Sequence, residues 1–444
     1  KHELIIFDST KVDVEESGLS HVHVHQLTKV LDDKGAAENA VYQIGYDPLS
    51  AFIEIEGITI YRKSGETEKL DMQNVLDYPA PARAIYWGAR EKMIGLGRLE
   101  PGDAFEVKLY RKGFTYALLH DGSDDERYIP PMRGHFYEIV EFWSEQPVLE
   151  KVYSVSIPDD KLVQYEVYNG EVKVSAKPAG EKFVYTFSKS DYSEPAREPN
   201  MVAKSDEFTK LLISTSPDWY AKSVWFYKVN EDFGSFESTL EIDRKVAEIL
   251  EGAENEMDSV ALLTHWVADN IRYSGISMGE GEGYTLHKGE MTFSDRCGVC
   301  KDKAGMLITM LRAAGFESYA AMTMAGSRID RIPADQFNHS VTVVKLSDGK
   351  YHVLDPTWVP FVRELWSSLE QQQNYLMGLP EGADLMITPV SDPSNHYLRI
   401  TGNSELIRNG TLNGNFTLEA EGQSDAAIRR LFTSGYVSEW KNSL

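Results

Sequence analysis

The sequence predicts an α+β protein in which an N-terminal antiparallel β-sandwich precedes a C-terminal domain of mixed helices and strands. The first 230 residues carry short runs of alternating apolar and polar side chains, separated by turn residues and without long helical patterns. From about residue 235, apolar residues recur at helical spacing and strand-like segments follow. Hydrophobic residues make up 42% of the 444 residues and charged residues 26%, which excludes disorder as the main state.

The strands of the N-terminal part are marked by period-two patterns and by turn residues. Apolar and polar residues alternate over 105–109, directly after a Pro-Gly-Asp turn at 101–103. Asn169-Gly170 is a strong hairpin signal, so we expect residues 164–168 and 171–175 to pair with each other. Repeated short strands of this kind indicate a β-sandwich.

Three helices are expected in the second half, over residues 242–250, over residues 258–273 and from Cys300 to the turn at Gly315. Strand-like segments follow at residues 317–325, 339–346 and 351–355. The last fifty residues read as two strands and a short helix over 425–431. We therefore expect a β-sandwich domain over residues 1–230, an α+β domain over residues 235–392, and a β-rich extension over residues 393–444 that is truncated.

The charge and the cysteine content exclude several classes of protein. Acidic residues outnumber basic ones 69 to 45, a net charge of −24 that disfavours nucleic acids and anionic membrane surfaces as partners. No apolar run approaches the roughly 18 residues of a membrane span. Only two cysteines occur, which excludes a disulfide-stapled scaffold. No basic-then-apolar leader opens the sequence, so we expect either a cytosolic protein or one whose signal peptide has been removed.

Cys300 is the strongest candidate for a chemical role. It stands at the start of a predicted helix, where unpaired N–H groups and the helix dipole favour an anion and therefore a thiolate. A thiolate nucleophile in acyl transfer needs a base and a group that orients that base. His339 opens one downstream strand and Asp355 closes the next, so the chain order is Cys, His, Asp.

These residues resemble the transglutaminase-like superfamily, the papain-related thiol enzymes with a Cys-His-Asp triad. The resemblance is to a bacterial form and rests on three motifs: Asn270-Ile271-Arg272-Tyr273, Gly283-Tyr284, and Gly298-Val299-Cys300-Lys301-Asp302-Lys303-Ala304. It implies a papain-like fold for the second domain, with Cys300 as nucleophile, His339 as general base and acid, and Asp355 as the residue that orients His339. Val299 departs from the family pattern, which usually has Asp there, and this affects the expected substrate preference more than the chemistry.

The resemblance extends to the N-terminal half. Tyr86-Trp87 and the turn Leu99-Glu100-Pro101-Gly102-Asp103 look like a β-rich domain of unknown function that precedes the catalytic domain in similar bacterial proteins. Most of those proteins are exported. The resemblance therefore implies the bacterial periplasm or cell envelope, reached through a removed signal peptide, while a cytoplasmic location stays open.

Other residues have competing interpretations. Tyr284 precedes Cys300 closely enough to line the substrate site or to help hold an oxyanion. The Cys297-x-x-Cys300 pair also fits a redox motif or half of a zinc site, although neither a preceding strand nor a second ligand pair supports these. His21, His23 and His25 share one strand face, as in a metal site or a solvated ladder. Trp266 is expected to pack in the core.

The predicted function is thiol-dependent acyl transfer on amide bonds, with hydrolysis by a peptidase or amidase favoured because no residue marks an amine acceptor. This chemistry needs no cofactor, and no metal site is expected; in particular, no calcium-binding loop occurs that would support calcium activation. The expected partners are peptide or protein substrates, including cell-envelope material. The alternatives are a cell-envelope binding protein with a vestigial triad and a protein-glutamine transglutaminase.

A triad requires His339 and Asp355 to share one face of a hairpin, and the turn decides this. A two-residue Asp348-Gly349 loop places them on opposite faces. A three-residue loop over 347–349, with Gly349 left-handed, pairs Leu346 with Lys350 and brings the two side chains diagonally together. We expect the three-residue loop, and we expect the His339 face to pack toward the Cys300 helix.

Overall fold

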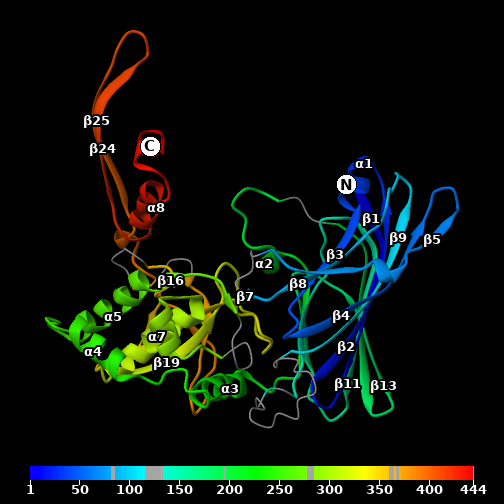
Figure 1. The fold of residues 1–444 in the computed structure, drawn as a ribbon, viewed down its shortest axis with the longest axis horizontal. Helices are drawn as coiled ribbons and strands as arrows, with labels where there is room; N and C mark the ends of the chain where they lie inside the picture. Colours follow the sequence, from blue (N-terminus) through cyan, green and yellow to red (C-terminus); the bar gives the residue numbers. More distant parts are fainter. Residues whose placement is uncertain are drawn as a thin grey trace.

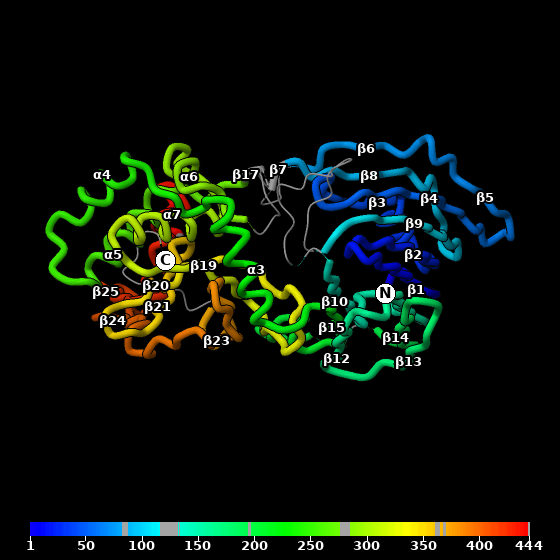
Figure 2. The backbone as a smooth tube through the Cα atoms, turned by 90° about the horizontal axis from the view of Figure 1, so that it is seen from below, coloured from blue at the N-terminus to red at the C-terminus, as the bar shows by residue number. Residues whose placement is uncertain are grey.

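The computed structural model describes residues 1–81, 86–115, 132, 134–193, 197–277, 285–359, 365–366 and 370–443. An N-terminal part built from strands and a C-terminal α+β part lie side by side along the long axis of the molecule (Figures 1 and 2). The α+β class and the order of the two parts agree with the expectation from the sequence.

The centre of the N-terminal part is an eight-stranded sheet in the order β13-β14-β11-β1-β2-β9-β4-β5. Its strands are β1 (Glu3–Val14), β2 (Leu19–Val30), β4 (Ala51–Tyr61), β5 (Thr67–Lys69), β9 (Ala104–Phe114), β11 (Val148–Pro158), β13 (Lys173–Ala179) and β14 (Lys182–Tyr192). All neighbours are antiparallel except β1 and β11, which run parallel with Val12 opposite Val155. The expected antiparallel arrangement therefore has one parallel pair.

Two three-stranded sheets complete the sandwich. One has the order β3-β8-β6, with β3 (Val41–Tyr46), β8 (Arg90–Gly95) and β6 (Leu76–Pro79), and the other has the order β10-β15-β12, with β10 (Tyr137–Glu141), β15 (Lys210–Ser214) and β12 (Gln164–Tyr168). The first buries Ile94 against Ile58 and Val107 of the large sheet. The second buries Leu211 and Ile213 against strands at the other end of that sheet. The alternating apolar residues therefore face a shared interior, as expected for a sandwich.

The hairpin expected at Asn169-Gly170 is wrong. β12 pairs with β15, whereas β13 pairs with β14, so this turn joins strands of two different sheets. Asn169 has a φ of 57°, the left-handed conformation that the Asn-Gly signal reports. A turn signal identifies a backbone conformation, and it does not identify the partner of the strands on either side.

The C-terminal part is a five-stranded sheet, β21-β20-β19-β22-β23, with helices packed on it. The strands are β19 (Glu317–Thr323), β20 (His339–Lys345), β21 (Tyr351–Leu354), β22 (Asn374–Met377) and β23 (Met386–Ile387), and the helices are α3 (Trp219–Glu231), α4 (Leu240–Ile249), α5 (Glu256–Asn270), α6 (Gly289–Asp295) and α7 (Cys300–Ala313). The three expected helices correspond to α4, α5 and α7. The sequence reading missed α3, whose Trp225 and Phe226 pack with Ile308 of α7.

Short elements connect these parts. They are α1 (Asp33–Glu38), β7 (Tyr86–Trp87), α2 (Lys204–Glu207), β16 (Arg272–Tyr273), β17 (Ile276–Ser277), β18 (Cys297–Gly298) and the 3₁₀ turns η1 (Met72–Asn74), η3 (Pro393–Asn395) and η4 (Val437–Glu439). β16 pairs with β18, and β7 of the N-terminal part pairs with β17. Consequently a strand of the N-terminal part joins the segment that follows β16.

The C-terminal extension is a hairpin of β24 (Leu398–Leu406) and β25 (Leu412–Ala420), followed by α8 (Gly422–Thr433) and α9 (Trp440–Ser443). The hairpin projects away from the α+β part and its strands are exposed (Figure 1). Two strands and a helix were expected here. Within the described ranges, no helix combines the length and the apolar character that crossing a membrane requires.

Candidate active site

Cys300 is the first residue of α7, and the residues around it hold the end of this helix in place. The N–H of Val299, the N-cap residue, donates a hydrogen bond of 2.7 Å to Oδ2 of Asp302. Gly298 permits this contact, because a Cβ atom at that position would lie 2.5 Å from Cβ of Asp302. The glycine and the aspartate of the motif therefore fix the backbone on either side of the cysteine.

The charged residues after Cys300 tie the first turn of α7 to neighbouring segments. Nζ of Lys301 donates to the carbonyl oxygen of Thr285 at 3.1 Å, and Nδ1 of His287 lies 2.6 Å from Oδ1 of Asp302. Lys303 donates to two carbonyl oxygens at the end of α5, those of Ala268 at 3.0 Å and Ile271 at 2.8 Å. Burial lowers the pKa of Lys303 to about 8. The buried charges of the motif thus tie the helix end that carries the cysteine to neighbouring segments.

The hairpin of β20 and β21 has the expected register. Val343 lies opposite Val353, and the N–H of Leu346 donates to the carbonyl oxygen of Lys350 at 3.1 Å. Gly349 has a φ of 77°, the left-handed conformation required of a three-residue loop. The prediction of this loop is confirmed.

His339 and Asp355 meet at the end of this hairpin. Nε2 of His339 lies 3.0 Å from Oδ2 of Asp355, and the N–H of Thr357 donates to Oδ1 of Asp355 at 2.8 Å. Burial lowers the pKa of His339, but the hydrogen bond and charge of Asp355, followed by those of the Cys300 sulfur, raise it to about 10. The imidazole thus interacts with the carboxylate and with the sulfur, and the structure brings together all three residues singled out in the sequence.

The expectation that the His339 face of the hairpin packs against the Cys300 helix is wrong. Thr342 donates to the carbonyl oxygen of Ala304 in α7 at 3.0 Å, and Val344 packs with the same helix. Val341 and Val343, on the His339 face, belong to a separate cluster that includes residues of β22. Both faces of β20 are buried, so the alternation of apolar residues did not reveal which face meets α7. His339 interacts with Cys300 from the first position of β20, where the helix and the strand begin.

Two further side chains lie beside the imidazole. The ring of Trp358 is 6.1 Å from that of His339, and Oε1 of Glu370 is 3.9 Å from Nε2 of His339. Glu370 is buried, and nothing in its sequence neighbourhood signals a role. His339, Asp355 and Glu370 offer ligand atoms that lie within 4.8 Å of one another, and within the described ranges these three residues form a group that could hold a metal ion.

Tyr284 lies outside the described residues. Another tyrosine of the quoted motifs, Tyr273, lies in β16 opposite Gly298. Burial raises the pKa of Tyr273, as does the charge of Cys300, and the backbone N–H of Cys300 interacts with its hydroxyl. The sequence reading quoted Tyr273 as part of a motif and gave it no role.

The remaining candidates have local partners. Cys297 lies in β18 opposite Arg272 and is free, like Cys300. Trp266 stacks on Phe293 at 5.8 Å, which confirms its packing role. In the histidine ladder of β2, each ring faces a carboxylate: His21 that of Glu15 at 2.8 Å, His23 that of Glu56 at 3.8 Å, and His25 that of Glu106. Each of these carboxylates thus faces a single ladder histidine.

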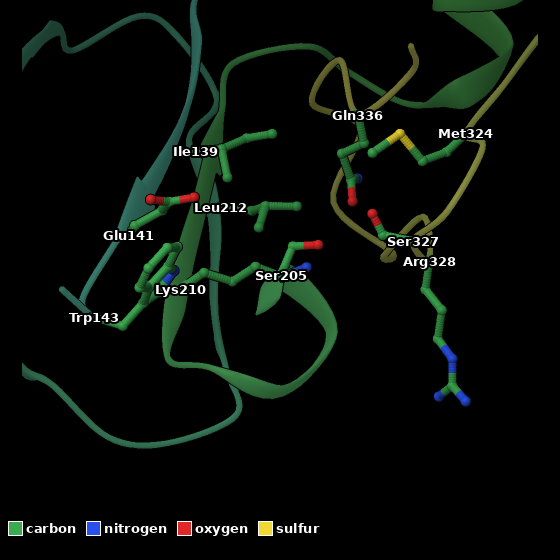
Figure 3. Close-up of a pocket in the computed structure, with 10 residues that line it drawn as sticks. All are labelled: Ile139, Glu141, Trp143, Ser205, Lys210, Leu212, Met324, Ser327, Arg328 and Gln336. Carbon is green, nitrogen blue, oxygen red and sulfur yellow. The ribbon is translucent and has the colours of Figure 1, made fainter. Parts of the chain in front are cut away.

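The N-terminal part supports the loop that leads to His339. Residues 324–338 connect β19 to β20, and a cavity of about 60 Å³ separates part of this loop from β10 and β15. Ile139 and Leu212 point across it toward Met324 and Gln336 (Figure 3). Beside the cavity, Leu212 packs on residues 332 and 334 of the loop, and Lys210 forms an ion pair of 2.7 Å with Asp330.

Two family models match the chain. Residues 16–196 match DUF3857, a domain of unknown function with solved structure, and residues 243–356 match the transglutaminase-like superfamily. No curated protein matches the chain.

A solved structure of similar fold matches most of the chain. A "putative protease" from Parabacteroides distasonis is 16% identical, with a TM-score of 0.69 over 87% of this chain and 72% of that one. A "putative cysteine protease" from Cytophaga hutchinsonii is 15% identical over 50% of this chain and 75% of that one, with a TM-score of 0.23. An M1 zinc metallopeptidase from Deinococcus radiodurans is 12% identical over 48% of this chain and 42% of that one, with a TM-score of 0.26. The first of these supports the arrangement of both parts of the chain.

Proposed function

The chain joins a DUF3857 domain to a transglutaminase-like domain, and from this premise we propose that it is a thiol-dependent enzyme that transfers acyl groups from amide carbonyls. Cys300 is the nucleophile, His339 the general base and acid, and Asp355 the residue that orients His339. The observation that carries the proposal is the buried hydrogen bond of 3.0 Å between His339 and Asp355. The imidazole of His339 also interacts with the sulfur of Cys300 at the start of α7.

The reaction follows from these contacts. The Cys300 thiolate adds to the carbonyl carbon, a C–S bond forms, and the carbonyl π electrons move to the oxygen. When the C=O bond re-forms, the C–N bond breaks and His339 transfers its proton to the departing amine. His339 then takes a proton from water, which attacks the thioester and releases the acid and the thiolate. Asp355 stabilises the imidazolium in both halves of the reaction.

Water is the acceptor in this proposal, so the enzyme is a peptidase or amidase rather than a cross-linking enzyme. The favoured substrates are peptides or proteins, including material of the bacterial cell envelope, and the proposed location is the periplasm or envelope. The net charge of −24 supports a substrate other than nucleic acid.

The test is turnover of a mixed library of peptides and isopeptides, with and without a small primary amine, read by mass spectrometry. The wild-type protein should release fragments with free carboxyl ends, and Cys300→Ala should release none. Products joined to the amine in preference to hydrolysed products would replace hydrolysis by transamidation. Equal turnover by the wild type and Cys300→Ala would contradict the proposed chemistry.

A further inference from the structure

A cavity of about 370 Å³ lies between the N-terminal sheets and the loop that leads to His339. It is bordered by one face of β2 and β9, by residues 136–139 at the start of β10, and by Asp335 of the loop. Figure 2 shows β10 on the side of the N-terminal part that is nearer to the C-terminal part. The volume falls within the roughly 300–1,000 Å³ of pockets that hold small ligands.

Arg111 lies on the face of β9 that builds the core of the sandwich. Phe105, Val107 and Leu109, the preceding residues on that face, are buried, and Val22 of β2 lies opposite Arg111. Arg111 itself is exposed and lines the cavity. Among the described residues it forms no hydrogen bond and no ion pair. The donors of its guanidinium are therefore available to an anion that enters the cavity.

The two acidic residues that line the cavity already have partners. Glu138 accepts a hydrogen bond of 2.7 Å from the hydroxyl of Tyr153. Oδ2 of Asp335 lies 3.5 Å from Nζ of Lys222, and both of these side chains are buried. Among the described lining residues, Arg111 is thus the charged group that lacks a counter-charge. A carboxylate complements it, because a guanidinium binds that planar anion through two parallel hydrogen bonds.

β10 offers a free edge to the same cavity. Among the described strands it pairs with β15 alone, at one end of the order β10-β15-β12. The N–H of Thr215 donates to the carbonyl oxygen of Phe136 at 2.8 Å, and the N–H of Phe142 donates to that of Thr209 at 2.9 Å. Because antiparallel neighbours bond through alternate residues, the N–H and C=O of Ile139 point away from β15. An extended peptide can pair with such an edge.

We propose that this cavity binds the C-terminal end of a peptide, which adds a strand to the free edge of β10 and places its terminal carboxylate on Arg111. Pairing along a strand edge and capture of a terminal carboxylate are both recurrent modes of peptide recognition. Binding here does not depend on the proposed acyl transfer, because the described lining residues include no member of the triad.

The test measures, by fluorescence anisotropy, the binding of fluorescein-Gly-Thr-Val-Thr-Val with a free C-terminal carboxylate. The full chain carries Cys300→Ala, so that the proposed nucleophile cannot consume the peptide. The same peptide with a C-terminal amide should bind at least about tenfold more weakly, because it lacks the anion for Arg111. Equal affinities of the acid and the amide would overturn the proposal. Displacement by acetate at the concentration at which the peptide binds would also overturn it, because acetate cannot pair with β10.

Matched variants locate the bound peptide. Arg111→Gln should weaken binding of the acid at least about tenfold and leave the affinity for the amide unchanged, and Arg111→Lys should lose less because it keeps the charge. Lys108→Gln alters an exposed cation on the opposite face of β9 and should change neither affinity. An unchanged affinity for the acid in Arg111→Gln would overturn the proposal, because the peptide would then bind elsewhere, including at the active site.

Two N-methylated peptides test the strand pairing without altering the protein. In an added strand only alternate residues direct their N–H groups toward β10. Methylation of the backbone nitrogen at one of the two residues, the third or the fourth, should therefore weaken binding about tenfold, and methylation at the other should not. A peptide that tolerates methylation at both positions, or that is weakened equally at both, would overturn the proposal.

Discussion

Nε2 of His339 lies 3.0 Å from Oδ2 of Asp355, and the two side chains are 5% and 0% exposed. In the sequence these residues are separated by the length of one hairpin, and the left-handed Gly349 decides that their side chains emerge on the same face. Because the pair is buried, its charge state should govern both stability and chemistry.

The stability conferred by His339 should fall as the pH rises. The folded-state pKa of His339, about 10, lies above its ordinary value of 6.5, so the stabilisation is complete below pH 6.5 and is lost as the pH rises through the folded-state pKa. The comparison is made in a Cys300→Ala background, which removes the thiol. There, the unfolding free energy lost on adding His339→Gln should shrink as the pH rises from 6.5 to the raised pKa of His339. This loss of unfolding free energy should change by no more than about 1.4 kcal/mol per pH unit. Urea denaturation at several pH values measures it, and a loss that grows with pH would contradict the pairing.

The proposed triad should behave as one unit in kinetics. Cys300→Ala and His339→Ala should each reduce kcat by about 10³-fold or more, and the double variant should be scarcely slower than either single one. Asp355→Ala should be milder, because Asp355 orients the base and does not react. Circular dichroism of each variant checks that the fold is intact. If the fold-losses in kcat of the two single variants multiply in the double variant, Cys300 and His339 act independently.

The two cysteines should differ in reactivity. Cys300 interacts with the imidazole of His339 at a helix N-terminus, whereas Cys297 lies in β18 opposite Arg272. Iodoacetamide should therefore alkylate Cys300 faster than Cys297, as measured by peptide mass spectrometry. Asp355→Asn should reduce the difference between the two rates. Equal alkylation rates for the two cysteines would remove the case for Cys300 as nucleophile.

Asp302 should be needed to hold the start of α7. Asp302→Ala removes the acceptor of the Val299 N–H and leaves Nδ1 of His287 without its partner, and both groups are buried. The expected cost is about 1–3 kcal/mol of unfolding free energy, with a fall in kcat that Asp302→Asn partly restores. Glu290→Gln, an exposed change in α6, should stay within about 0.5 kcal/mol. An unaltered urea midpoint for Asp302→Ala would contradict this role.

The ion pair between Lys210 and Asp330 should link the N-terminal part to catalysis. Lys210 lies in β15, and Asp330 lies in the loop that ends at His339. Lys210→Ala should lower kcat severalfold and destabilise the protein by about 1–3 kcal/mol, because the carboxylate of Asp330 loses its largely buried ion-pair partner. A double-mutant cycle with Asp330→Ala measures the coupling, and Lys173→Ala on the exposed strand β13 is the control. Zero coupling would mean that the loop is positioned by its apolar contacts alone.

The sequence by itself determined the local elements and much of the site. The helix at Cys300 was predictable because helical spacing and the Gly315 terminator are local properties. The register of the hairpin was predictable because only a three-residue loop with a left-handed glycine gathers its apolar residues on one face. Charge and composition correctly favoured a folded protein with packed domains.

Only the tertiary structure decided how these elements meet. The Asn169-Gly170 turn encodes a backbone conformation, and the choice of partners for its strands depended on which sheets were already adjacent. Both faces of β20 are buried, so the packing of the whole domain determined which face meets α7. Glu370 and Tyr273 reach the site through contacts between segments distant in sequence, and no periodicity or spacing records such contacts.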